Sequence, residues 1–308
     1  MKKSLLIASD IHRNDGVSNL KEVLGLVKSD SRAVQPETVL LGGDYAGGGG
    51  RPPASLESPE GRAVWVPVYE TREFEEEVRS VLGEETRVFM TYGSHDKNAI
   101  GKFFTGPAGC GGFYVYGISF VQMKFACRQQ LEIPDPRRGL YDGPDVNDEF
   151  GSCASEAAEN FLKWADSLED DKPVFVMSHI PMHLHRHDNL GASIWCDCLN
   201  EAGKKRPIYF FFCHNHTAER SSALDRQYYL VLPGQTLPVQ GPEAEDSIEK
   251  ELNFTYLNGG YVIKGCATLV TMDWEGEQLK EVEIKRYALE SAERGFGDTG
   301  LPMPYVVR

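Results

Sequence analysis

Five short, mostly apolar stretches of this chain each run directly into an aspartate or a histidine. The apolar stretch 5–9 is followed by Asp10 and His12, and the stretch 39–43 by Asp44. In the same way, 87–94 is followed by His95 and Asp96, 174–178 by His179, and 208–213 by His214 and His216. Short apolar runs that end at glycines or polar residues are typical of buried strands. Open α/β sheets bind ligands at the carboxyl ends of their strands. We therefore expect these side chains to meet in one site.

The first pair, Asp10 and His12, has the spacing of two metal ligands on one strand end. Side chains two positions apart in an extended backbone point to the same side. An isolated Asp-x-His fits a solvated turn equally well. The interpretation as a metal site therefore depends on the repetition of the pattern at the other strand ends.

The order of expected helices and strands predicts a layered fold. Apolar residues recur at helical spacing over residues 18–29, 71–82 and 152–168, and these segments alternate with the strands named above. Strands dominate the last third, at residues 228–232, 261–263, 267–273 and 279–287, and residues 113–123 are expected to form a long strand or a strand pair. We expect an α/β (α+β) chain folded as a four-layer αββα sandwich, with two mixed sheets flanked by helices.

The chain is expected to form a single domain over residues 1–308, with its polar motifs within residues 5–216. The strands of the second sheet are expected mainly within residues 226–288, and residues 289–308 are expected to form a tail. Three segments rich in glycine, proline or polar residues, 45–67, 128–150 and 180–200, are interpreted as irregular insertions that shape specificity.

The charge balance narrows the possible partners. The formal charge is −14, from 32 basic and 46 acidic residues, and no basic run is longer than residues 204–206. This balance disfavours nucleic acids and anionic membrane surfaces as partners. The apolar runs are of strand length, so we expect no membrane span and a cytoplasmic location. Nothing in the sequence indicates an oligomeric state.

The seven cysteines have no Cys-x-x-Cys spacing, which favours reduced thiols. Zinc binding by Cys196 and Cys198 is a weaker alternative.

Taken in order, the polar motifs resemble those of the calcineurin-like metallophosphoesterase family. The matching segments are Asp10-Ile11-His12, Gly43-Asp44, Gly93-Ser94-His95-Asp96, Ser178-His179 and Cys213-His214-Asn215-His216. They correspond to the family's Asp-x-His, Gly-Asp, Gly-Asn-His-Asp/Glu, lone His and Gly-His-x-His, and they span residues 5–216.

The resemblance implies a site with two metal ions. One ion would be held by Asp10, His12 and His216, and the second by His179 and His214, while Asp44 bridges the two. A set of nitrogen and oxygen ligands without thiolate suits Mn²⁺, Fe²⁺ or Fe³⁺, Zn²⁺ or Co²⁺.

The resemblance also implies a mechanism for hydrolysis. A hydroxide shared by the two ions would attack phosphorus in line. His95 would stabilise the transition state or protonate the leaving oxygen. Asp96, at the neighbouring catalytic position, is expected to orient an adjacent group.

Two departures from the family pattern concern the second metal ion and its surroundings. Ser94 occupies the position of the asparagine that binds the second ion and touches the substrate phosphate. A hydroxyl is a shorter and poorer ligand than an amide carbonyl, so we expect the second ion to be held through water or more weakly. Cys213 replaces a glycine and is expected to be a small buried group.

Arg13 and His183 are candidate contacts to substrate. Arg13 adjoins His12 and could meet a phosphate oxygen. His183 lies in a short segment with His185 and His187, which follows His179. A solvated loop is the preferred interpretation of that segment, and substrate contact is the alternative.

The sequence thus predicts a metal-dependent hydrolase of a small phosphomonoester or phosphodiester. Two alternatives remain: a nuclease, which the acidic surface disfavours, and a catalytically impaired relative that binds a phosphorylated ligand, which Ser94 favours.

Overall fold

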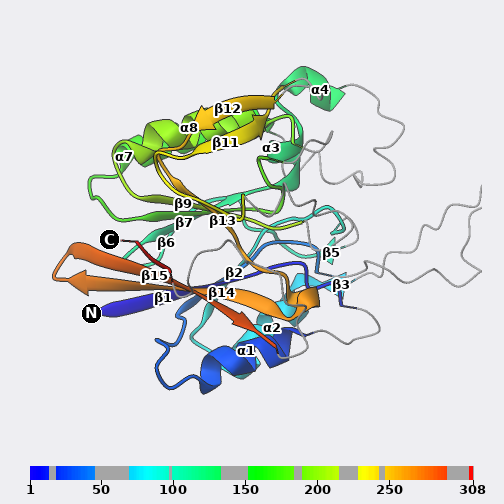
Figure 1. Cartoon of the computed structure of the whole chain (residues 1–308). Helices are drawn as coiled ribbons and strands as arrows, with labels where there is room; N and C mark the ends of the chain where they lie inside the picture. Colours follow the sequence, from blue (N-terminus) through cyan, green and yellow to red (C-terminus); the bar gives the residue numbers. More distant parts are fainter. Residues whose placement is uncertain are drawn as a thin grey trace, which may run out of the picture.

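Two six-stranded mixed sheets lie face to face in the computed structural model (Figure 1). The structure describes residues 1–13, 19–45, 69–96, 99–132, 152–183, 189–214, 228–242, 247–289 and 305–307, and all structural statements concern these residues.

The first sheet contains the amino-terminal strand at its centre. Its order is β16 (Tyr305–Val307), β15 (Gln278–Ala288), β14 (Cys266–Glu275), β1 (Lys2–Ala8), β2 (Thr38–Leu41) and β4 (Arg87–Met90). Strands β1, β2 and β4 are parallel, while β14 is antiparallel to β1. The carboxyl ends of β1, β2 and β4 therefore share one edge of this sheet.

The second sheet has a parallel centre between two antiparallel edges. Its order is β10 (Leu230–Val231), β13 (Thr255–Asn258), β9 (Ile208–Phe212), β8 (Val174–Ser178), β7 (Tyr114–Ile118) and β6 (Gly106–Gly109). Strands β13, β9, β8 and β7 run parallel to one another.

Helices cover the outer face of each sheet (Figure 1). α1 (Leu20–Ser29) and α2 (Thr71–Leu82) pack on the first sheet. α3 (Phe120–Lys124), α7 (Ala154–Ser167) and α8 (Ala192–Gly203) pack on the second sheet. The remaining elements are β3 (Tyr69–Glu70), β5 (Ala99–Ile100), α4 (Arg128–Glu132), the hairpin of β11 (Thr236–Gln240) and β12 (Ser247–Glu251), and a 3₁₀ turn at Val262–Lys264. The predicted four-layer sandwich is confirmed.

Alternation along the central strands produces the layers. In β9, Phe210 and Phe212 face the helices of the second sheet, while Tyr209 and Phe211 face the first sheet. Successive side chains of a strand point to opposite faces, so a continuously apolar strand is buried on both sides. Each fully buried phenylalanine contributes roughly 1.5–3 kcal/mol through removal from water. The strand ends are therefore held on a rigid base.

Three predicted elements differ from those of the structure. Residues 113–123 do not form one long strand, because Ser119 ends β7 and begins α3 through a capping box with Gln122. Segment 180–200, expected to be irregular, contains most of α8. Residues expected as a strand at 261–263 overlap the 3₁₀ turn, which ends at Gly265 in the left-handed region.

Strand pairing accounts for two further differences. β14 and β15 extend the first sheet through β1, so the strands of residues 226–288 are divided between the sheets. Residues 289–308, expected to form a tail, include β16, which pairs with β15. Pairing partners depend on contacts across the whole chain, which local pattern does not contain. No described helix is both long and apolar enough to cross a membrane.

Candidate metal centre

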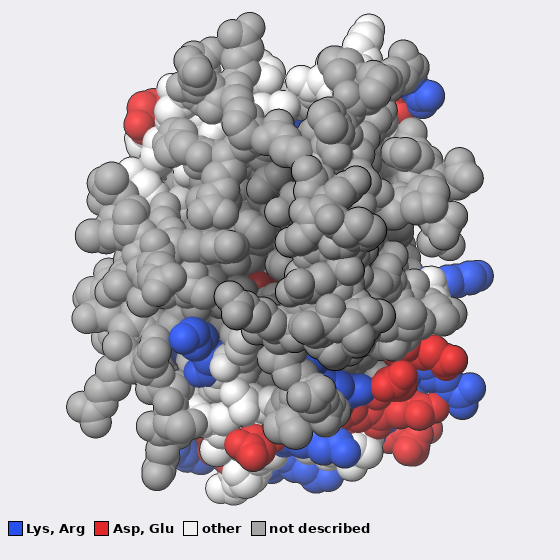
Figure 2. Space-filling model, turned by 90° about the vertical axis from the view of Figure 1, so that its right-hand side faces the viewer, with Lys and Arg blue, Asp and Glu red and all other residues white. Residues whose placement is uncertain are grey.

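The candidate site lies where the carboxyl ends of β1, β2 and β4 face those of β8 and β9. The aspartates and histidines at these ends are Asp10, His12, Asp44, His179 and His214, and all five are buried. Figure 2 looks onto this end of the molecule, where an acidic side chain is visible near the centre of the face. The structure places these five side chains at one end of the two sheets.

The five side chains form two groups that share one carboxylate. Asp10, His12 and Asp44 form one group, and Asp44, His179 and His214 form the other; within each, the possible ligand atoms lie within 4.8 Å of one another. The His12 Nε2 atom is 3.7 Å from Asp44 Oδ2, and the His179 Nε2 atom is 3.1 Å from the same oxygen. Asp44 is therefore placed to contact two cations at once.

The tautomer of His179 is set by its backbone contact. Its Nδ1 atom lies 2.8 Å from the Gly42 carbonyl oxygen, which can only accept a hydrogen bond, so Nδ1 carries the proton. In the neutral ring, the Nε2 lone pair then faces Asp44 Oδ2 at 3.1 Å and His214 Nδ1 at 3.1 Å. Such a convergence of electron pairs needs a proton or a cation between them. The donor set of this group thus fits a metal ion.

The electrostatics of the group lead to the same conclusion. Burial alone would lower the pKa of His179, but the adjacent Asp44 carboxylate raises it to about 9. Burial would raise the pKa of Asp44, but His179 and the neighbouring histidines His95 and His12 hold it well below its usual range. Asp44 is therefore a charged carboxylate in a buried site, and positive charge beside it is what keeps it charged.

The backbone is strained at four of the candidate ligands. Asp10, His12, Asp44 and His214 have φ angles of 50°, 44°, 57° and 74°, and they are the non-glycine residues with positive φ in the described part of the chain. A residue held in this left-handed region costs on the order of 1–3 kcal/mol. The strain is confined to the strand ends that carry the ligands, so the surrounding fold imposes this conformation.

Asp96 fixes the backbone under the shared carboxylate. Its Oδ2 accepts hydrogen bonds from the amides of Asp44 at 2.8 Å and Gly93 at 2.7 Å, and its Oδ1 accepts one from Tyr45 at 2.9 Å. Gly93 is needed here, because a Cβ atom at this position would lie 2.5 Å from Asp44 Oδ1. Tyr45 does not point at the site, since its hydroxyl contacts the carbonyl oxygens of Leu41 and Thr91.

Ser94 and His95 also contact Asp44. The Ser94 Oγ atom is 3.3 and 3.2 Å from the two carboxylate oxygens of Asp44, so its hydroxyl donates to that carboxylate. The His95 amide donates to Asp44 Oδ1 at 2.8 Å, and its Nε2 atom is 4.0 Å from Asp44 Oδ2. The His95 side chain is 38% exposed, unlike the buried histidines around it. Of this cluster, His95 is the histidine that a substrate can reach from solvent.

The two predicted substrate contacts are both engaged elsewhere. The Arg13 guanidinium donates to Glu73 at 2.8 Å and to Glu77 at 2.5 Å, and it lies over the Phe74 ring of α2. A role of Arg13 toward substrate stays a prediction.

His183 is 2% exposed, so the interpretation of its segment as solvated is wrong at this residue. Its Nδ1 atom is 2.8 Å from the Tyr256 hydroxyl, and its ring contacts Phe212 and Tyr228. Substrate contact by His183 stays a prediction. His185, His187 and His216 lie outside the described residues.

The cysteines are also placed. Cys213 is fully buried, as expected. Cys196 and Cys198 are buried on α8 and belong to neither candidate metal group of the described residues.

Sequence patterns missed the turn after β13. The amides of Val262 and Ile263 donate to the carbonyl oxygens of Ser9 at 2.8 Å and Asp10 at 2.9 Å. This turn therefore holds the backbone at Asp10. The glycine pair 259–260 at the end of an apolar strand was the available signal, but it lacks an acidic or imidazole side chain.

Comparison with known proteins gives one family and several distant structures. Residues 3–218 match the family model described as calcineurin-like phosphoesterase. No curated protein matches the chain. A dimetal phosphatase from Danio rerio has a TM-score of 0.48 and 10% identity, covering 93% of this chain and 96% of that chain. A hypothetical protein from Thermus thermophilus has a TM-score of 0.41 and 12% identity, over 94% and 99% of the two chains. A phosphopantetheinyl hydrolase from Mycobacterium tuberculosis has a TM-score of 0.36 and 12% identity, over 84% and 90%.

Proposed function

The chain belongs to the calcineurin-like phosphoesterase family, and from this premise we propose that it is a two-metal enzyme that hydrolyses a small phosphomonoester or phosphodiester. Family membership supports the broader activity, metal-dependent hydrolysis of phosphoesters. The observation that carries the two-metal proposal is the position of Asp44, whose carboxylate belongs to both candidate metal groups.

Each ligand residue has a role in this proposal. Asp10 and His12, with His216, would hold one ion, and His179 and His214 would hold the second. Asp44 would be shared by the two. Bound ions of this kind, Mn²⁺, Fe²⁺ or Fe³⁺, Zn²⁺ or Co²⁺, supply neutralisation of phosphate charge and a water of lowered pKa. Ser94 donates to Asp44 and so helps to orient the bridging carboxylate.

His95 is proposed to act on the substrate directly. Its side chain is accessible, and the hydrogen bond from its backbone amide to Asp44 Oδ1 holds the His95 backbone beside the carboxylate that would bridge the ions. A histidine in this place can donate a proton to the leaving oxygen or stabilise charge that develops on it. Asp96 acts indirectly, because it holds the backbone that carries Asp44.

The test is hydrolysis of aryl phosphomonoesters and bis-aryl phosphodiesters by the Mn²⁺-loaded protein, with Asp96→Asn and Arg206→Met as comparisons. We expect turnover by the wild type, a large loss in Asp96→Asn, and full retention in Arg206→Met, because Arg206 lies at the opposite end of β9 and contacts the Leu168 carbonyl oxygen. Absence of turnover on every substrate, with metal bound, would contradict the proposal. Cleavage of oligonucleotides in preference to small esters would support the nuclease alternative.

One feature favours a second candidate, a relative that binds a phosphorylated ligand without turnover. Ser94 occupies the family's asparagine position, and its hydroxyl is engaged by Asp44. Ser94→Asn separates the candidates. A large gain in rate would show that the natural site is impaired, whereas strong wild-type turnover without such a gain would exclude impairment.

A further inference from the structure

A guanidinium lies between the two sheets, behind the metal centre. Arg286 is on β15 and pairs with Thr268 of β14, which in turn pairs with Ile7 of β1. Paired residues of neighbouring strands lie on the same face, and Ile7 belongs to the apolar cluster between the sheets. Arg286 therefore projects from the first sheet toward the second. No described carboxylate lies within salt-bridge distance of its guanidinium.

The partner of Arg286 is the last residue of a strand in the other sheet. Its Nη1 atom donates to Asn258 Oδ1 at 3.0 Å and its Nη2 atom donates to the Asn258 carbonyl oxygen at 2.8 Å. The planar guanidinium fork can reach both oxygens at once, which a lysine ammonium cannot do with the same geometry. Asn258 is fully buried and ends β13. The contact thus links the two sheets.

Asn258 begins the turn that holds both ligand-bearing strand ends. Its Oδ1 accepts a hydrogen bond from the Gly260 amide at 3.0 Å, and its Nδ2 donates to the Tyr261 hydroxyl at 2.6 Å. At one end of this turn, the Gly259 amide donates to the carbonyl oxygen of Phe212 in β9 at 2.8 Å. At the other end, the amides of residues 262 and 263 donate to the carbonyl oxygens of residues 9 and 10, which follow β1. The turn therefore connects the strand end of His214 with that of Asp10.

The turn has little freedom to move. A Cβ atom at Gly259 would lie 2.8 Å from a methyl group of Ile7, and one at Gly260 would lie 3.1 Å from the backbone of Ala267. Asp10 and His214 also contact each other across the sheets, since the His214 amide donates to Asp10 Oδ2 at 3.2 Å. A shift of the turn would therefore move the candidate ligands of the two ions relative to each other.

We infer that Arg286 is a positioning residue of the metal centre: by holding Asn258, it fixes the turn that sets the distance between the Asp10 and His214 strand ends. The inference rests on the proposed function in that it concerns the same metal centre. Groups behind metal ligands affect metal affinity by about 10–100-fold when they are removed. Arg286 differs from such groups in acting through a backbone turn.

Calorimetric titration of the metal-free protein with Mn²⁺ tests the inference. Arg286→Met is expected to weaken Mn²⁺ binding by about 10-fold or more. Arg286→Lys keeps the charge but loses the fork, and it should also weaken binding. The matched control is Arg206→Met, which removes a buried arginine that contacts a backbone carbonyl far from the site. The control should keep the wild-type affinity even when its stability falls.

Asn258→Ala tests the same link from the other side and remains informative where Arg286→Met fails to fold. Because Arg286 acts through Asn258, the double variant Arg286→Lys/Asn258→Ala should lose no more affinity than the weaker-binding single variant. Equal affinities of the Arg286 variants and the Arg206 control, or additive losses in the double variant, would overturn the inference.

The titrations and the turnover assay together distinguish failure of this inference from failure of the proposed function. Tight Mn²⁺ binding by the wild type without turnover would overturn the proposed hydrolysis, while the titrations would still decide the role of Arg286. Absence of Mn²⁺ binding by the wild type would overturn both.

Discussion

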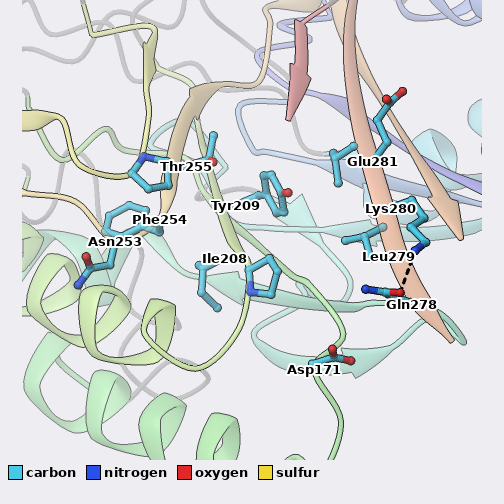
Figure 3. Close-up of a pocket in the computed structure, with 13 residues that line it drawn as sticks. Asp171, Ile208, Tyr209, Asn253, Phe254, Thr255, Gln278, Leu279, Lys280 and Glu281 are labelled. Atoms are coloured by element: carbon cyan, nitrogen blue, oxygen red, sulfur yellow. Dashed lines mark hydrogen bonds between the residues drawn. The ribbon is translucent and has the colours of Figure 1, made fainter. Parts of the chain in front are cut away.

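The two ends of the paired sheets differ in where their polar groups lie. At the carboxyl ends of β1, β2, β8 and β9, buried aspartates and histidines converge and the backbone is left-handed at four of them. At the opposite end, a cavity of about 290 Å³ lies between the start of β15 and the starts of β9 and β13 (Figure 3). Its lining includes apolar residues such as Tyr209 and Phe254 together with Asp171 and Lys280.

The cavity end lacks the features that favour chemistry at the other end. Lys280 donates to Gln278 at 2.9 Å and also pairs with Glu275, so its charge is satisfied at the surface (Figure 3). None of the cavity-lining residues has a positive φ or belongs to a candidate metal group. Strain and buried charge therefore coincide at one end of the sheets, and this cavity lies at the other. Here the arrangement of side chains, and not the presence of a cavity, marks the candidate metal centre.

The largest expected effect comes from the carboxylate shared by the two metal groups. Asp44→Asn keeps the shape but removes the charge, so both ions should be lost and hydrolysis should fall to background. Asp10→Asn is the matched comparison, because Asp10 belongs to only one group. Elemental analysis should find one ion in Asp10→Asn and none in Asp44→Asn. Equal metal contents in the two variants would remove the distinction between a bridging and a terminal ligand.

The next largest expected effect is on turnover alone, and it separates a role in catalysis from a role in metal binding. His95→Ala should lower turnover by about 10²–10⁴-fold, because it removes a group that assists the leaving oxygen. Its metal content should equal that of the wild type, since His95 belongs to neither metal group. Full turnover in this variant would remove His95 from the mechanism.

Backbone strain can be tested by comparing the free energies of unfolding of a glycine variant and an alanine variant at the same position. At His214, with φ of 74°, glycine should give a more stable metal-free protein than alanine by about 1 kcal/mol, because alanine is disfavoured in the left-handed region. At Lys280, in strand β15 at the cavity end, alanine should be the more stable by roughly 0.5–1 kcal/mol. Urea unfolding in the presence of a chelator measures both differences. The same sign at both positions would refute the claim that strain is confined to the metal end.

The smallest expected effect concerns the ion pair of Lys285 and Asp30, which lies outside both the metal centre and the cavity. The hydrogen bond from Lys285 is the main cause that lowers the pKa of Asp30 below its ordinary value. A lowered folded-state pKa gives stability that is present above the ordinary carboxyl pKa and is lost as the pH falls through the folded-state value. Asp30→Asn should therefore lower the melting temperature at pH 7 by only about 1–2 °C, and this difference should narrow steadily as the pH falls below about 4. A difference that persists in acid would mean that packing, not charge, is responsible.

Sequence patterns predicted the elements whose signals are local. The helix expected over 71–82 has the bounds of α2, because its apolar spacing is regular and the Glu70–Glu73 capping box marks its start. Helix α8 was missed, since its N-cap residue Gly191 has no side chain that could cap the helix and the preceding segment, 181–190, contains a proline and three histidines.

The contacts of the candidate site also divide into those that local sequence patterns predict and those that depend on the packing of the whole chain. The carboxyl ends of neighbouring parallel strands share one sheet edge, so the proximity of Asp10 and Asp44 follows from the pattern. His179 follows β8 of the second sheet, so its approach to Asp44 depends on how the two sheets pack. The contact of Arg286 with Asn258 depends on β14 and β15 joining the first sheet, and no local signal indicates that pairing. The position of Arg13 depends likewise on the packing of α2 against the strand end.

Metal stoichiometry after equilibration with Mn²⁺ tests the central claim most directly. Elemental analysis of the purified wild-type protein should find two ions per chain, because Asp44 is shared by two groups of ligands. One ion or none would contradict the two-metal centre.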